Sequence, residues 1–209
     1  MGMSCLAQSD NYQLGLLPAL NINAKTGEAY RLNAKIESRN TLYQMSSFDS
    51  EYELTDVSFV VSKRIGISNA LGFGYLMRID NGELIHRFIQ QFNLVTSGDG
   101  IKWGHRFLLD QTLINGSADT WRLRYRLSGL LPLNGQSIDP KEFYIKLQNE
   151  YLNIFRDDYD LEIRANVFMG YKFSDANKLE FGMDNRIRNL IARGVNVQSW
   201  LRMSWYLTI

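Results

Sequence analysis

Cysteine and proline are both scarce in this chain of 209 residues. Proline interrupts the hydrogen-bonded ladder of a sheet, so the presence of only three prolines suits a chain that is mostly β-strand. The one cysteine, Cys5, lies in an opening segment that resembles the end of a secretory signal peptide, with small residues suited to cleavage near Ala7. We therefore expect residues 1–8 to be a signal-peptide remnant. An acylated Cys5 and a disordered start of a soluble protein are the alternatives.

Long apolar runs and an excess of charge are also missing. No uncharged apolar run approaches the roughly 18 residues of a membrane helix, which excludes a helical membrane protein. There are 23 Lys and Arg against 22 Asp and Glu. A nucleic-acid-binding protein usually carries a basic stripe, so we expect no nucleic-acid partner.

The motifs of common catalytic and cofactor sites are absent. The sequence has no phosphate-binding loop, no glycine-rich dinucleotide motif, no zinc-type spacing of Cys and His, and no haem motif. We expect no cofactor, no metal site and no catalytic residue.

The sequence does have an alternation of apolar and polar residues along its whole length. At its end, one parity holds Leu201, Met203, Trp205, Leu207 and Ile209, and the other holds Arg202, Ser204, Tyr206 and Thr208. Successive side chains of a strand point to opposite faces, so this pattern predicts a strand with one apolar and one polar side.

Eleven segments with this alternation, separated by short breaks rich in Gly, Asn, Asp and Ser, are predicted to be strands. They are Tyr12–Asn23, Tyr30–Tyr43, Leu54–Lys63, Leu71–Asp80, Glu83–Thr96, Ile101–Leu113, Trp121–Leu133, Phe143–Phe155, Leu161–Phe173, Lys178–Ile191 and Gln198–Ile209. No linker or composition shift marks a second domain, so residues 9–209 are expected to form one all-β domain. Bacterial membrane barrels have even strand numbers. We therefore expect an antiparallel transmembrane barrel of about 10–12 strands, with twelve favoured.

Alternation alone does not decide whether the apolar face covers a soluble core or meets lipid. Three features favour a membrane barrel over a soluble lipocalin-like barrel or sandwich. Most segments exceed the roughly 9–11 residues that cross a bilayer, and the polar face carries both charge signs densely. Bulky aromatic residues also lie near the segment ends, as in the girdles of membrane barrels; they are Trp103, Trp121, Phe143, Tyr171, Phe173 and Trp205.

Several segments resemble a family of proposed outer-membrane barrels known as domain of unknown function 2490. They are Leu14–Pro18, Lys35–Arg39, His86–Phe92, His105–Gln111, Arg122–Arg126, Pro132–Gln136, Gly170–Phe173 and Lys178–Gly182. The resemblance implies an outer-membrane barrel of a Gram-negative cell and brings no activity or catalytic residue. Outer-membrane proteins usually end in an aromatic residue that the barrel-assembly machinery recognises, whereas this chain ends in Ile209.

The polar face is the first candidate for a functional site. The predicted lumen or pore residues are Arg122, Arg124, Arg126, Arg106, Arg164, Arg186, Arg202, Glu37, Asp110, Glu162, Glu180 and Asp184. One interpretation is a network of ion pairs that fills a narrow barrel. The other is a pore that favours anions, with the three arginines from Arg122 to Arg126 as its ladder.

Two histidines and two longer connections complete the candidates. His86 and His105 share the parity of the apolar residues, and an outer-leaflet hydrolase with His86 as general base is a further alternative. The segment Gln44–Glu53 is predicted to be a long outer loop, and Asn134–Lys141 a longer connection on the opposite side.

The first functional hypothesis is a structural barrel or an assembly component with a charge-filled lumen. A narrow, porin-like anion channel is the second. The expected partners are outer-membrane lipid, the barrel-assembly machinery and other outer-membrane proteins.

Overall fold

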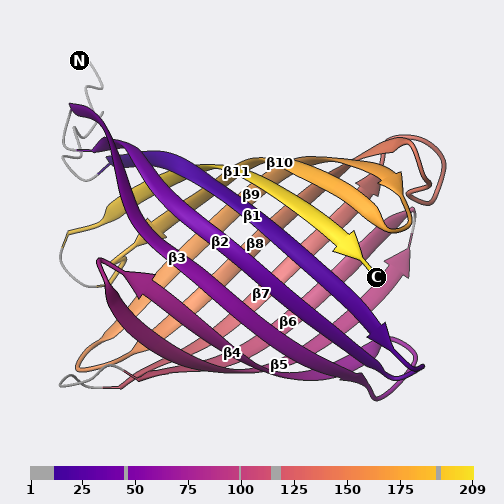
Figure 1. Ribbon diagram of the computed structural model, residues 1–209, viewed down its shortest axis with the longest axis horizontal. Coiled ribbons are helices and arrows are strands. Elements are labelled where there is room, and N and C mark those ends of the chain that lie inside the picture. Colours follow the sequence, from indigo (N-terminus) through magenta and orange to yellow (C-terminus); the bar gives the residue numbers. More distant parts are fainter. Residues whose placement is uncertain (1–11, 45–46, 99, 114–118, 192–193) are drawn as a thin grey trace, which may run out of the picture.

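The computed structural model describes residues 12–44, 47–98, 100–113, 119–191 and 194–209. In these ranges eleven strands close into one barrel (Figure 1). The strands are β1 (Tyr12–Thr26), β2 (Tyr30–Gln44), β3 (Ser47–Arg64), β4 (Asn69–Asp80), β5 (Glu83–Gly98), β6 (Ile101–Leu113), β7 (Thr120–Pro132), β8 (Glu142–Phe155), β9 (Tyr159–Ser174), β10 (Asn177–Arg188) and β11 (Asn196–Thr208). Each predicted segment coincides with one strand, so the predicted all-β barrel is confirmed. Across these ranges, no helix has the length and apolar character to cross a membrane.

The barrel closes through a parallel pairing of its first and last strands. The other ten pairings are antiparallel, whereas β1 and β11 run side by side from the pair Tyr12 and Val197 to the pair Asn23 and Thr208 (Figure 1). Strands that alternate in direction bring an odd-numbered last strand parallel to the first. The preference for an even number of strands was therefore wrong. Alternation shows which residues share a face of a strand, but it carries no information about how many strands the barrel has.

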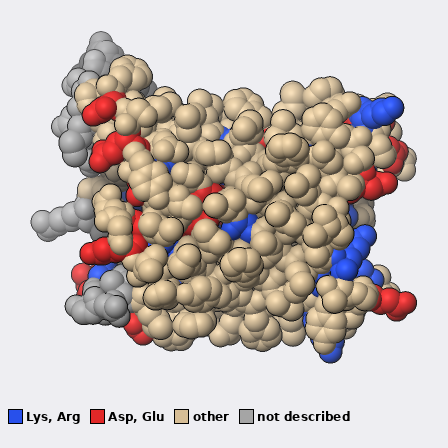
Figure 2. All heavy atoms as spheres, viewed as in Figure 1, with Lys and Arg blue, Asp and Glu red and all other residues tan. Residues whose placement is uncertain are grey.

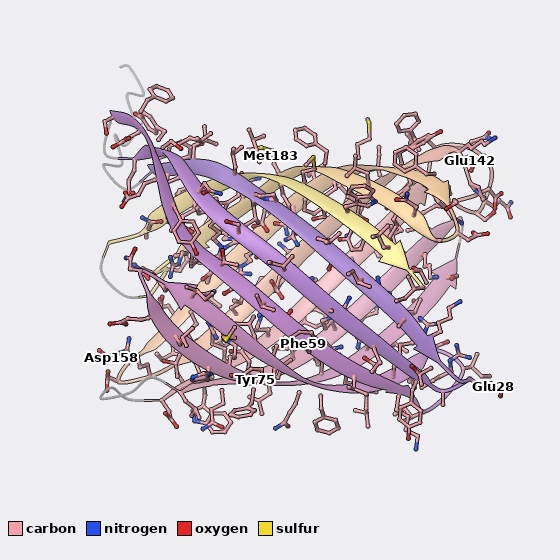
Figure 3. All side chains as sticks on the ribbon, viewed as in Figure 1. Glu28, Phe59, Tyr75, Glu142, Asp158 and Met183 are labelled. Atoms are coloured by element: carbon pink, nitrogen blue, oxygen red, sulfur yellow. The ribbon has the colours of Figure 1, made fainter. Side chains whose placement is uncertain are left out.

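The two ends of the barrel carry different sets of turns. The turns after β1, β3, β5, β7 and β9 lie at the end where the chain terminates, which we call the C-terminal end; the other turns lie at the N-terminal end. Figure 3 shows Glu28 and Glu142 at the C-terminal end and Asp158 at the other. At the N-terminal end, Asn81 and Gly82 both have positive φ, 48° and 84°, as the predicted Asn-Gly hairpin requires.

One predicted loop is replaced by strand. The segment Gln44–Glu53 was expected to be a long loop, but β2 continues to Gln44 and β3 begins at Ser47. Residues 45–46 lie outside the described residues. The rings of Tyr43 and Phe48 pack at 4.9 Å between centroids across this hairpin, and such a cross-strand contact extends the ladder. The connection after β7, which spans residues 133–141, remains a longer turn at the C-terminal end.

The outer face of the barrel is apolar and exposed. Every strand carries a large apolar side chain on this face, and Phe73 on β4 is 65% exposed. The others include Leu16, Ile36, Phe59, Phe88, Phe107, Leu123, Leu147, Val167, Phe181 and Met203. Figure 2 shows charged side chains concentrated at the two ends, with a mostly uncharged wall between them.

On one side of the lumen, aromatic rings lie over inward glycines of the neighbouring strand. Trp200 is paired with Gly15, and Tyr144 is paired with Gly170. A Cβ atom added at Gly170 would lie 2.2 Å from the Tyr144 ring, and one at Gly15 would lie 2.5 Å from the Trp200 ring. The glycines therefore leave the space that these buried rings fill, which makes the wall of β8, β9, β11 and β1 thick and closely packed.

Candidate functional site

The lumen collects the charged side chains of the polar face. All twelve predicted lumen residues lie on the inward side of the wall, either buried or lining the internal cavity. They come from six strands: Glu37 from β2, Arg106 and Asp110 from β6, Arg122, Arg124 and Arg126 from β7, Glu162 and Arg164 from β9, Glu180, Asp184 and Arg186 from β10, and Arg202 from β11.

Asp110 and Glu150 join the arginines of β7 into one network. Asp110 accepts ion pairs from Arg122 at 2.6 Å and from Arg124 at 3.4 Å. Arg124 also reaches Glu150 at 3.0 Å, and Arg126 reaches the same carboxylate at 3.1 Å. The three arginines predicted to form an anion ladder are thus bound to carboxylates of the wall.

The same network continues to both sides. Arg87 on β5 lies 3.6 Å from Asp110. In the other direction Arg164 lies 3.5 Å from Glu150 and 2.6 Å from Glu162. One continuous chain of charges therefore runs along β5 to β9.

A second chain of charges crosses the parallel seam. Arg202 of β11 contacts Asp184 at 3.3 Å and Glu37 of β2 at 3.1 Å. Because β1 lies between β11 and β2, Arg202 reaches past it, over the inward side chains Leu17 and Ala19. This arginine links the two strands that flank β1 and so stabilises the closure of the barrel.

The second chain also extends to both sides. Arg186 pairs with Asp184 at 2.8 Å, and the Arg78 guanidinium binds Asp56 through two hydrogen bonds of 2.8 Å. We call the residues of the two chains the ion-pair belt, which draws members from every strand except β1: Glu37, Arg39, Asp56, Arg78, Arg87, Asp110, Arg122, Arg124, Arg126, Glu150, Glu162, Arg164, Asp184, Arg186 and Arg202.

The lumen beyond the belt, toward the N-terminal end, is packed mostly with uncharged side chains around Glu53, whose carboxylate accepts hydrogen bonds from Gln13 and Thr41. Gln198 donates a hydrogen bond of 2.7 Å to Gln13, which donates one of 2.7 Å to Thr41. These three side chains, Leu54 and Thr112 are all buried, and none of them lines the cavity. The N-terminal side of the lumen is thus filled.

A cavity of about 880 Å³ occupies the other side of the lumen. Its lining includes Ala29 and Ser68, which belong to turns at the C-terminal end, so the cavity reaches the rim there. Farther in, the belt lines the cavity, and the lining also includes Arg188, the last residue of β10, which lies 3.5 Å from Glu162 and whose side chain is 48% exposed. We call this cavity the cup; it opens at the C-terminal rim and is narrowed by the belt.

The lining of the cup is strongly cationic, with sixteen Arg and Lys side chains against three carboxylates. The cause lies in side-chain length. The side chains of Asp110, Glu150 and Asp184 are at most 3% exposed, whereas those of Arg124 and Arg126 keep 14% and 25%. Short carboxylates stay at the wall, and long guanidinium groups stand between them and the cavity. The cup consequently presents donors and positive charge to anything inside it.

Both histidines point away from the lumen, toward the outer face. The Nδ1 atom of His86 lies 2.5 Å from the Tyr75 hydroxyl, and that of His105 lies 2.9 Å from the Tyr125 hydroxyl. The rings of each pair stack, with interplanar angles of 23° and 26°. Within the described part of the chain, neither imidazole is hydrogen-bonded to a serine or a carboxylate. The arrangement lacks the nucleophile that a general base would activate.

Sequence reasoning missed the aromatic part of the lumen. Trp200 is fully buried, and the guanidinium groups of Arg39 and Arg186 each lie 5.9 Å from its ring centre. Tyr144 and Lys146 both bind Glu180, at 2.8 Å and 2.6 Å. Trp200 lies two residues from Arg202 and therefore on the same face of the strand, which could have indicated that its ring is in the lumen. Only polar and charged side chains of that face were predicted to belong to the site.

Comparison with known proteins gives one match. A family model described as protein of unknown function (DUF2490) matches residues 15–197. No curated protein and no solved structure matches the chain. Among the described residues no group of three or more His, Cys, Asp and Glu side chains is arranged to hold a metal ion.

Proposed function

Because the chain belongs to the family of proteins of unknown function DUF2490, a description that carries no activity, we propose its function from the barrel alone. The proposal is a structural outer-membrane barrel of a Gram-negative cell. Its wall spans the bilayer, and its ion-pair belt closes the lumen to free passage of solutes. The observation that carries the proposal is the exposure of large apolar side chains on all eleven strands, with ion-paired charges turned inward.

Lipid is the environment that suits this outer face. Soluble monomers rarely expose apolar patches larger than a few hundred Å², whereas here the apolar face continues around the barrel. The strands have 12 to 18 residues, enough to cross a bilayer that needs about 9–11. Exposed aromatic side chains near the strand ends suit the two interfaces; they include Trp103, Trp121, Phe143, Phe173 and Trp205.

The size of the barrel supports a closed lumen. Barrels of about 8 strands are filled by their own side chains, and those of about 16–18 leave a water channel. Eleven strands lie between these limits. Here the interior space is divided between the belt, which blocks the passage, and the cup, which opens at one end.

The membrane part of the proposal is tested by heat-modifiable migration on a gel. Membrane barrels resist unfolding by detergent at room temperature and migrate differently before and after boiling. We expect the purified protein, folded into detergent micelles, to shift its mobility on boiling and to co-sediment with liposomes. A protein that stays soluble without detergent and does not shift would contradict the proposal and favour the soluble barrel.

A narrow anion-selective channel is the second candidate function, and the cationic lining of the cup favours it. It requires the belt to open, because Arg124 and Arg202 are each held by two carboxylates. Stable anion-selective current steps would support this candidate over the closed barrel.

A hydrolase centred on His86 draws no support from its tyrosine partner. Outer-membrane lipid and the barrel-assembly machinery remain the proposed partners.

A further inference from the structure

One corner of the cup has cations without carboxylate partners. Lys102 and Arg106 of β6 line the cavity, and no carboxylate of the described residues lies within ion-pair distance of either. Arg126, directly opposite Arg106 in the β6–β7 register, brings a third positive charge to the same place. Like charges on facing positions repel; Arg126 is compensated by Glu150 at 3.1 Å, whereas Lys102 and Arg106 lack the compensation found in the belt.

The donors of Arg106 are only partly used. Its Nε atom donates a hydrogen bond of 2.9 Å to the Asn93 side chain, and its two terminal nitrogens have no protein partner among the described residues. A guanidinium fork offers five N–H donors and binds oxyanions through two parallel hydrogen bonds. The contact with Asn93 fixes the side chain and leaves its terminal edge free for a ligand.

A second hollow lies against the same side chains. A pocket of about 180 Å³ adjoins the cup, and seven residues line both spaces, one of which is the apolar Val95. We call the other six the cationic corner: Asn93, Lys102, Arg106, Arg126, Ser128 and Gln148. All six carry polar or charged groups, so the corner is a recess with donors on several sides and not a flat charged surface.

Two buried donors without partners belong to residues that line the cup. The Nε atom of Arg124, next to Arg126 on the inward face of β7, is buried and makes no hydrogen bond. The side-chain amide nitrogen of Asn21, on β1, is likewise buried and unpartnered, and the residue is 6% exposed. Both residues line the cup. A buried donor without a partner is costly, and of these two Arg124, two residues from Arg126 on the same face of β7, lies beside the corner.

We propose that the cationic corner binds a small phosphate-bearing anion that enters the cup from water at the C-terminal rim. A tetrahedral phosphate accepts hydrogen bonds from several directions, as the free edge of the Arg106 guanidinium, the Lys102 ammonium group and the neutral donors of this recess provide. Arg126 adds positive charge, although Glu150 holds its Nε atom and one terminal nitrogen. The size of the cup is in the range of small-molecule sites, about 300–1,000 Å³. The site requires only the folded barrel, so it is independent of whether the lumen conducts.

The test is titration calorimetry of the full chain, folded in a nonionic detergent, with inorganic pyrophosphate as the probe at constant ionic strength. We expect saturable binding that Arg106→Gln and Lys102→Gln each weaken about tenfold or more, since each removes a charge-assisted contact. Arg156→Gln, in a turn at the N-terminal end, removes an equal charge outside the lumen and should leave the affinity unchanged.

Three outcomes would overturn the proposal. These are absence of saturable pyrophosphate binding by protein that still shows the heat shift, binding that both corner variants retain, and equal weakening by Arg64→Gln, which removes a cavity charge outside the corner. A short-chain phosphatidic acid in the same micelles separates the two sources of phosphate. If the lipid binds and pyrophosphate does not, the ligand is a headgroup and the soluble anion is rejected. Loss of the heat shift in the wild type counts against the membrane barrel and not against this site.

Discussion

The ion-pair belt and the cationic corner both place arginines on neighbouring parts of the same strands. They differ in whether those arginines have carboxylate partners. In the belt, Arg124 is shared by two carboxylates that lie within 3.4 Å of it. In the corner, Arg106 has an amide as its protein partner. Both arginines line the same cavity.

The difference shows that the partners of a charge decide its role. A guanidinium group that two carboxylates hold fills space and joins strands, because its donors are used within the wall. A guanidinium group fixed through one nitrogen keeps its other donors for a ligand. The belt is therefore interpreted as structure, and the corner as a recognition site.

The largest expected effect comes from breaking the belt. Asp110→Asn removes the carboxylate charge that three arginines share, so that Arg87 and Arg122 lose their carboxylate in a buried place and Arg124 keeps Glu150 alone. We expect the free energy of unfolding to fall by about 3–5 kcal/mol. The measurement is the urea midpoint for loss of the heat-modifiable band in micelles.

The matched control removes a charge from the corner. Lys102→Gln takes away a cation that has no carboxylate partner among the described residues, and it should change the free energy of unfolding by no more than about 0.5 kcal/mol. Equal destabilisation by the two variants would remove the distinction between belt and corner.

A smaller effect is expected from the packed wall where inward glycines lie against aromatic rings. Gly170→Ala would place a Cβ atom 2.2 Å from the Tyr144 ring, so the ring must move from its buried position. Overpacking of this kind costs about 1–3 kcal/mol, measured as a lower urea midpoint. Gly98→Ala is the control, since its Cβ would have no neighbour within 4 Å. If both variants unfold at the wild-type midpoint, the glycines do not serve the packing of the rings.

Much of the architecture could be predicted from alternation, because the period of a strand is fixed by its backbone. That period placed Arg202 and Glu37 on the inward face and Met203 on the opposite face. It could not give the strand total or the parallel closure, since both depend on which strands meet. The start of β3 at Ser47 was missed because Asp49, Ser50 and Glu51 form a run of polar residues that interrupts the alternation.

The sequence could predict which charged residues lie in the lumen, but it could not predict which of them pair with one another. Arg106 and Arg126 have the same parity and similar neighbours in the sequence, and only the register reveals that Glu150 lies opposite Arg126 while Asn93 and Arg126 lie opposite Arg106. Pairing across strands is a long-range property. The sequence therefore identified the charges of the lumen without showing which of them are compensated.

Current through a planar lipid bilayer tests most directly the central claim, that the belt closes a membrane-spanning barrel. The protein should insert, as shown by the heat shift of the same preparation, and give no stable current steps, while Asp110→Asn should produce steps if it remains inserted. Stable, ohmic current steps from the unmodified protein would contradict a closed lumen, and anion selectivity of those steps would establish the channel in its place.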